Sequence, residues 1–248
     1  MPTSGDGAAK EHRTVSRVTT ILELAAAGPG GVRLSELAEQ LGAPRSSIHG
    51  LVKGLVATGY LREEDGAYTI GPAVGTLLAA ATPSIEQAAR PVMRRLGERF
   101  GETVMLAEPV GDSVVYTETV ESTQMIRYSA PLRTRRPLYP TSSGKCVLAF
   151  ARKRFRDNYL SAHVPDGEQR NRVEQELTEI AETGIAVNRG ETMPDVYGIG
   201  VPVLVGERVL AVLATAGPSH RMAGRVDEIA AAARLAAREV SELITRRG

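Results

Sequence analysis

Residues 33–70 contain two short amphipathic segments, joined by a tight turn and followed by two strand-like segments. The apolar residues of the first segment are Leu34, Leu37, Ala38 and Leu41, and those of the second are Ile48, Leu51, Val52 and Leu55. This i, i+3, i+4, i+7 spacing predicts one helix in each segment. Gly42 and Ala43 form the turn between them, and Pro44 suits the first turn of the second helix, where a missing N–H costs nothing.

The second helix is predicted to carry a small, polar outer face. With its apolar residues inward, it turns Ser46, His49, Gly50 and Lys53 outward. Residues 60–62 and 68–70 then flank a predicted turn over residues 63–66, which together indicate a β-hairpin. A helix-turn-helix followed by a hairpin is a winged helix, and such an outer face is typical of a helix that enters the DNA major groove.

The expected DNA contacts are hydroxyl, imidazole and cationic groups of this unit, because these can bond base edges or phosphates. The predicted set is Arg13, Arg17, Arg45, Ser46, Ser47, His49, Gly50, Lys53 and Arg62. Each of them has a plain alternative as a solvated surface residue. Residues 1–75 carry slightly more acidic than basic side chains, so a winged helix that docks protein instead of DNA also stays open.

The remaining composition bounds the class of protein. A chain of 248 residues is long enough for two compact domains, and its formal net charge of +1 does not by itself indicate a nucleic-acid partner. No apolar run approaches a membrane span, and residues 1–12 are polar and lack a signal-peptide core. The single cysteine, Cys146, fits a reducing compartment. We therefore expect a cytoplasmic protein with no membrane partner.

The pattern of elements predicts an α+β chain. A disordered tail over residues 1–12 precedes the winged helix of residues 13–72, and an apolar linker helix covers residues 73–83. Residues 84–248 form a second domain in which helices and strands follow without regular βαβ alternation, which favours a central antiparallel sheet. Its strands are expected at 103–109, 113–121, 185–188, 198–205 and 208–215, and its helices at 85–100, 146–151, before Gly184, and at 224–246.

Several motifs, in this order, resemble the IclR family of bacterial transcription regulators. In the first domain they are residues 34–38 (Leu-Ser-Glu-Leu-Ala), 41–47, 59–61 and 68–72. In the second they are residues 137–149, with Pro137, Thr141, Gly144 and Lys145 in place, then Gly184-Ile185, Glu191, and Gly217-Pro218. The resemblance implies an N-terminal winged helix and a C-terminal effector-binding domain with a GAF or profilin-like fold. It also implies homodimers or tetramers and no catalysis. Because residues 73–81 are apolar all round, we expect them, together with a helix at about residues 14–27, to carry the dimer contact.

The effector site is predicted where residues 141–144 lead into a helix, because free N–H groups and the positive end of the helix dipole attract a small anion. Simple helix capping by Thr141 or Ser142 is the alternative. The resemblance carries further contacts onto this chain, and the predicted effector set is Arg136, Ser142, Ser143, Gly144, Asn188, Val196, Gly198, Ala214 and Ala216. Several members of the family carry acidic, thiol or hydroxyl groups where this chain has Asn188, Gly198, Ala214 and Ala216. The resemblance therefore implies a roomier and less polar pocket here, which favours an aromatic or longer organic acid over a two-carbon acid.

Few residues of this sequence indicate another kind of chemistry. Gly144-Lys145 lacks the preceding glycine of a phosphate loop, the four histidines have no metal-ligand spacing, and no nucleophile elbow is present. We therefore expect no cofactor and no metal, and Cys146 is interpreted as a core residue. The hypothesis is a ligand-responsive, sequence-specific DNA-binding transcription regulator, with repression expected. The alternative is a metabolite-binding or enzymatic module whose winged helix docks protein.

Overall fold

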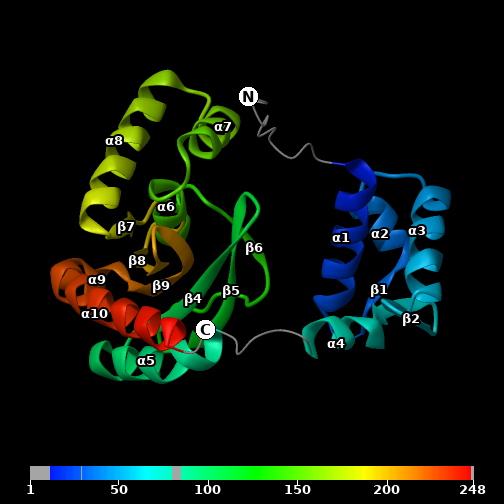
Figure 1. The fold of residues 1–248 in the computed structure, drawn as a ribbon, viewed down its shortest axis with the longest axis horizontal. Helices are drawn as coiled ribbons and strands as arrows, with labels where there is room; N and C mark the ends of the chain where they lie inside the picture. The colour runs from blue at the N-terminus through cyan, green and yellow to red at the C-terminus, as the bar shows by residue number, and fades with distance from the viewer. Residues whose placement is uncertain (1–11, 29, 80–84, 247–248) are drawn as a thin grey trace, which may run out of the picture. The chain divides into compact units, whose positions relative to one another are not determined.

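The computed structural model describes residues 12–28, 30–79 and 85–246, and the chain divides into two compact units, residues 1–82 and 83–248 (Figure 1). Except for His12, the predicted tail lies outside the described residues, as does the 80–83 end of the predicted linker helix. Within the described part of the chain, no helix is long and apolar enough to cross a membrane.

The first unit is a winged helix. Its elements are α1 (Arg13–Ala26), β1 (Val32–Arg33), α2 (Leu34–Gln40), α3 (Arg45–Ala57), β2 (Leu61–Glu64), β3 (Ala67–Ile70) and α4 (Pro72–Ala79). The three strands form an antiparallel sheet in the order β1-β3-β2. The prediction did not include β1, because a strand of two residues is too short to show alternation.

Two details of the winged helix differ from the prediction. Pro44 is the residue that caps α3 and not its first helical residue, so α3 begins at Arg45. The hairpin turn consists of Asp65 and Gly66 alone, both with positive φ (51° and 74°), as a two-residue turn between twisted strands requires. The predicted inward residues are otherwise confirmed, since Ile48 and Val52 are fully buried beside Ile21 and Leu37.

The second unit is built on one six-stranded antiparallel sheet in the order β6-β5-β4-β9-β8-β7. Its elements are α5 (Ile85–Phe100), β4 (Thr103–Val110), β5 (Ser113–Val120), β6 (Arg135–Pro137), α6 (Ser142–Ala149), α7 (Lys153–His163), α8 (Gly167–Thr183), β7 (Ala186–Arg189), β8 (Val196–Val205), β9 (Arg208–Pro218), α9 (Ser219–Met222) and α10 (Val226–Thr245). The predicted α+β fold with a central antiparallel sheet is confirmed.

Three elements of the second unit correct the prediction. No strand is predicted at Arg135–Pro137, which form the edge strand β6. Helix α7 is not predicted either, because its buried residues are only Tyr159 and Leu160. Helix α6 begins at Ser142, four residues before the predicted start at Cys146, because the Thr141 hydroxyl caps it. The predicted end of α8 is confirmed, since Gly184 adopts the left-handed conformation that terminates helices.

Helices cover both faces of this sheet (Figure 1). Successive side chains of a strand point to opposite faces. In β4, Val104 and Leu106 pack with residues of α5 and α10, whereas Met105 and Ala107 pack with residues of α6 and α8. This alternation follows from the two-residue period of a strand. It decides which side chains can contribute to a site under α6.

Candidate functional site

The outer face of α3 has the composition that was predicted from its sequence. Arg45, Ser46, Ser47, His49, Gly50 and Lys53 are all exposed. No side chain within the described residues caps α3, and the Ser47 N–H donates to the Pro44 carbonyl at 3.0 Å. The N–H groups of Arg45 and Ser46 are the ones that a phosphate can reach at the positive end of the helix dipole. The helix thus presents hydrogen-bonding groups and two cations on one face.

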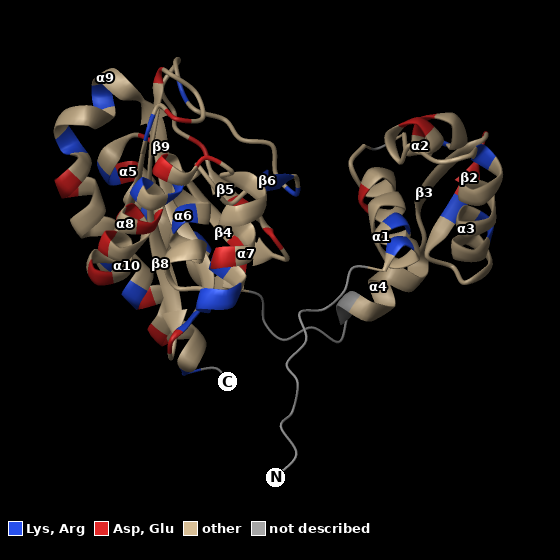
Figure 2. Cartoon of the chain, turned by 90° about the horizontal axis from the view of Figure 1, so that it is seen from above, with Lys and Arg blue, Asp and Glu red and all other residues tan. Residues whose placement is uncertain are grey.

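Arg13 and Arg17 lie one turn apart on α1 and line a hollow together with Leu41 and Gly42 of the helix-turn-helix turn. The structure therefore brings these two cations beside the turn that leads into α3. The colouring of Figure 2 marks basic residues on α1 and α3 and acidic residues on α2. The positively charged side chains of this unit therefore gather in local groups, since the net charge of the whole unit is small.

The recognition-helix lysine is paired with the wing. Lys53 Nζ lies 2.5 Å from Glu63 Oε2, and the Tyr68 hydroxyl donates to Glu63 Oε1 at 3.2 Å. The hydrogen bond between Lys53 and Glu63 raises the pKa of Lys53 and lowers the pKa of Glu63. Arg62 is also exposed but alternates with Glu63 along β2, so it points to the other face of the hairpin. A phosphate contact by Lys53 therefore competes with Glu63.

The second candidate site is a pocket under the start of α6. Its floor follows the sheet register, because Asn188 of β7, Gly198 of β8 and Ala216 of β9 are direct cross-strand neighbours. Met105 of β4 and Ala214 of β9 are paired in the same way and face the same side. The walls come from Arg136, Thr141, Ser142 and Val196, together with Tyr116, Tyr128, Thr192 and Met193.

Of the nine predicted effector residues, seven line this pocket: Arg136, Ser142, Asn188, Val196, Gly198, Ala214 and Ala216. Ser143 and Gly144 do not. Ser143 is fully buried, and a Cβ on Gly144 would lie 2.0 Å from the Leu138 carbonyl oxygen. Gly144 therefore allows the backbone of residue 138 to pass close to α6, and its N–H donates to Thr141 Oγ1 at 3.0 Å. Thr141 therefore caps α6, and it also lines the pocket.

The predicted effector set lacks six lining residues: Met105, Tyr116, Tyr128, Thr192 and Met193, together with Thr141, which belongs to the predicted 141–144 segment. The alternation in β4 and β5 could have identified Met105 and Tyr116 as neighbours on one face. Tyr128, Thr192 and Met193 lie outside helices and strands, where no periodic pattern identifies them. The larger of these side chains occupy the space that the glycine and alanines of the floor leave.

The pocket is consequently small, whereas the expectation that it is roomier than the pockets of relatives stays a prediction. Its open volume is about 40 Å³, whereas one water requires roughly 10–15 Å³ and a cavity that binds benzene has about 150 Å³. An acid of two or three carbons fits this volume better than an aromatic one. An aromatic ring would need side chains of the wall to move.

Arg136 supplies the charge of the pocket. Its Nε is buried and has no hydrogen-bond partner within the described part of the chain. Its guanidinium carbon lies 5.9 Å from the centre of the Tyr116 ring. Burial raises the pKa of Tyr116, so the hydroxyl stays protonated and able to donate. An unsatisfied buried guanidinium N–H is unfavourable, and a carboxylate oxygen is the partner that suits it best.

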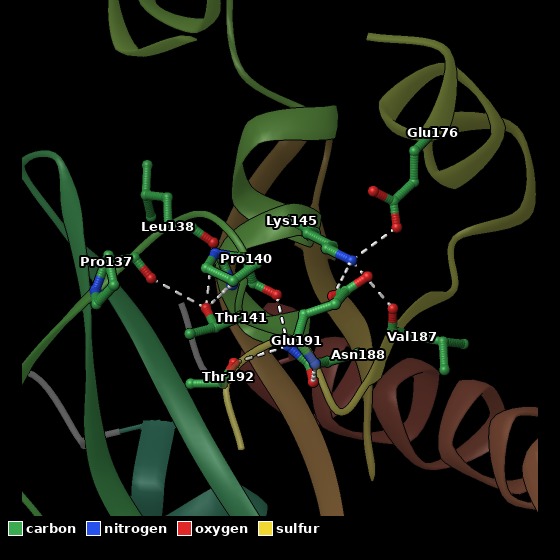
Figure 3. A network of polar contacts seen from close by, with 11 residues as sticks. Pro137, Leu138, Pro140, Thr141, Lys145, Glu176, Val187, Asn188, Glu191 and Thr192 are labelled. Atoms are coloured by element: carbon green, nitrogen blue, oxygen red, sulfur yellow. Dashed lines mark hydrogen bonds and ion pairs between the residues drawn. The ribbon is translucent and has the colours of Figure 1, made fainter. Parts of the chain in front are cut away.

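A polar network fixes the far wall of the pocket (Figure 3). Asn188 Nδ2 donates to the Pro140 carbonyl and to Thr192 Oγ1, both at 2.7 Å, and its Oδ1 accepts from the Glu191 N–H at 3.2 Å. Both amide protons are thus engaged within the protein. Asn188 lines the pocket chiefly as an anchor for residues 190–193.

Two family models match this chain. The IclR helix-turn-helix domain matches residues 14–65, and the model described as bacterial transcriptional regulator IclR C-terminal matches residues 78–242. The chain belongs to the IclR family of bacterial transcription regulators. The HTH-type transcriptional regulator BhcR of Paracoccus denitrificans, an IclR-type relative, is 30% identical over 250 residues, which cover 92% of this chain and 86% of that protein.

Solved structures of IclR-type proteins share the fold. A crystal structure from Silicibacter sp. TM1040, assigned to the ICLR transcriptional regulators, is 27% identical, with a TM-score of 0.78 and coverage of 93% of this chain and 96% of that one. An IclR homolog of Microbacterium hydrocarbonoxydans, solved in complex with 4-hydroxybenzoate, is 23% identical, with a TM-score of 0.74 and coverage of 92% and 98%.

Proposed function

We propose that this IclR-family regulator binds operator DNA through α3 and senses a compact carboxylic acid in the pocket under α6. The observation that carries the ligand class is the buried Arg136 Nε, which has no hydrogen-bond partner among the described residues. The start of α6 adds the positive end of a helix dipole at the same pocket. A carboxylate is the simplest group that would satisfy both.

The size of the acid is argued from the volume of the pocket. About 40 Å³ favours a two- or three-carbon acid, in contrast to the aromatic acid favoured by the floor residues alone. The Microbacterium homolog was solved with 4-hydroxybenzoate, which supports a carboxylic acid as the ligand class. Acetate and 4-hydroxybenzoate are therefore the two probes that bracket the proposal.

We also propose that the protein acts as a homodimer or tetramer on a two-fold symmetric operator. Val15 on α1 is 59% exposed and Leu77 on α4 is 61% exposed, which fits apolar faces covered by a second copy. Multi-angle light scattering of the full chain measures the mass directly. A monomer at the concentration that binds DNA would contradict this proposal.

DNA binding is tested by gel shift on the DNA upstream of the protein's own gene. We expect binding that prefers this sequence over a random duplex and that weakens with salt. Ser46→Ala or His49→Ala should change base preference, whereas Lys53→Ala should weaken all sequences alike. Glu64→Gln on the wing is the control without a contact from α3. Equal affinity of all variants, or the absence of a salt-sensitive shift, would favour the protein-docking alternative.

Ligand binding is tested by thermal shift with acetate and 4-hydroxybenzoate against their neutral analogues acetamide and 4-hydroxybenzyl alcohol. A ligand at 100 times its Kd should stabilise the protein by about 2.7 kcal/mol. Arg136→Gln should abolish the effect of the acid, whereas Arg135→Gln, its neighbour on the other face of β6, should retain it. Equal shifts with acid and neutral analogue would refute recognition through the charge.

A further inference from the structure

Lys145 is the most deeply buried cation of the described residues, with a side chain that is 0% exposed. Its Nζ donates to Glu176 Oε1 at 2.7 Å, to Glu191 Oε2 at 2.5 Å and to the Val187 carbonyl at 3.2 Å. An ammonium group has three protons to donate, so its hydrogen-bonding capacity is fully used. Lys145 is therefore a junction in the protein and has no proton left for a ligand.

The two carboxylates on this ammonium belong to different parts of the second unit (Figure 3). Glu176 lies on α8, which takes no part in the pocket lining. Glu191 lies in the connection between β7 and β8, directly before Thr192 and Met193, which do line the pocket. The same cation thus meets one carboxylate beside the pocket wall and one remote from it.

The connection at 190–193 has few other anchors. Asn188 bonds Thr192 Oγ1 and the Glu191 N–H, and Gly190 turns the chain with φ of 85°, where a Cβ would lie 2.7 Å from the Pro194 carbonyl oxygen. Met193 is 49% exposed, and its carbonyl accepts from the Val196 N–H at 3.0 Å, while the Asp195 carbonyl accepts from the Ser219 N–H at 2.8 Å. The ion pair with Lys145 is the one charged anchor among those described.

We propose that Glu191 is a positioning residue for the pocket, because its pairing with Lys145 holds residues 190–193 closed against the floor and so sets the largest acid that enters. This inference rests on the proposed effector site. With this wall closed, the open volume of the pocket is about 40 Å³. An open wall would admit a larger acid. Glu176 shares the ammonium without touching the wall, so it is a matched control.

The first measurement needs no ligand. Amide hydrogen exchange is compared in the full-length wild type, Glu191→Ala and Glu176→Ala. We expect exchange in residues 190–196 to rise about tenfold in Glu191→Ala, since a hydrogen bond to a charged group contributes roughly 1.5 kcal/mol or more. Glu176→Ala should leave this segment at the wild-type rate. Unchanged exchange in Glu191→Ala, or an equal rise in both variants, would overturn the proposal.

The second measurement tests ligand size by titration with acetate and 4-hydroxybenzoate. In Glu191→Ala, the affinity for 4-hydroxybenzoate relative to acetate should rise at least about tenfold, whereas Glu176→Ala should keep the wild-type ratio. A merely structural loss would lower both affinities together and would contradict the size limit. If neither acid binds any variant, the proposed ligand class fails, and the exchange comparison still decides the role of Glu191.

Discussion

Helices α3 and α6 begin with closely related sequences but lie in opposite environments, one exposed and one buried. Pro44-Arg45-Ser46-Ser47 starts α3, and Pro140-Thr141-Ser142-Ser143 starts α6. In α3 only Ile48 and Val52 are buried, and both serines are exposed. In α6 all eight residues are buried, and Ser142 and Ser143 are 7% and 0% exposed.

The difference comes from what each helix packs against. One side of helix α3 packs against α1, α2 and the wing, and its polar side is exposed to solvent. Helix α6 lies directly on the sheet and also contacts α8. Its approach to the sheet is so close that a Cβ on Gly200 would be 2.8 Å from the Ser142 carbonyl oxygen. The same kind of helix start therefore becomes an exposed surface in one unit and a pocket wall in the other.

The lysines of the two helices give the largest expected contrast. Lys145→Ala should destabilise the second unit by about 3 kcal/mol, because it leaves two carboxylates without their shared cation. Lys53→Ala should change stability too little to resolve, since its pair with Glu63 is exposed. Chemical denaturation followed by circular dichroism measures both. A larger loss for Lys53→Ala would reverse the contrast.

The glycines of the two helices give the next contrast. Gly144→Ala should destabilise the second unit by about 2–3 kcal/mol, because the new Cβ would meet the Leu138 backbone at 2.0–2.4 Å. Gly50→Ala meets nothing within 4 Å on α3 and should stabilise the first unit by about 0.5–1 kcal/mol. Thermal unfolding of both variants tests this. Equal and small effects would mean that α6 is packed as loosely as α3.

The smallest effect is expected for the thiol in α6. Cys146 is buried, and burial raises its pKa to about 12, so at pH 8 it is a protonated thiol without access to reagent. We expect no labelling by a thiol reagent in the native protein and full labelling after denaturation. A Ser46→Cys variant should gain one fast-labelling thiol on α3. Rapid labelling of the wild type would show that the shell around α6 opens readily.

The winged helix was the more predictable half. Its helices follow apolar residues at regular spacing, and the outward residues of α3 follow from the same periodicity. The pocket was only partly predictable, because its floor depends on strand register and its walls on loops. Ser142, Gly198 and Ala216, which the sequence assigns to the effector site, line the pocket, whereas Tyr116, Tyr128 and Met193, which limit its volume, are not predicted.

The sequence by itself determined the two domains' fold classes, the polar face of α3 and the family, because local periodicity and short motifs encode these directly. Only the tertiary structure decided that Lys53 is held by the wing, that Lys145 joins two carboxylates, and that the pocket is small. Each of these depends on residues distant in the chain meeting at a few ångströms. Sequence spacing does not determine such distances, whereas sheet register and helix packing do.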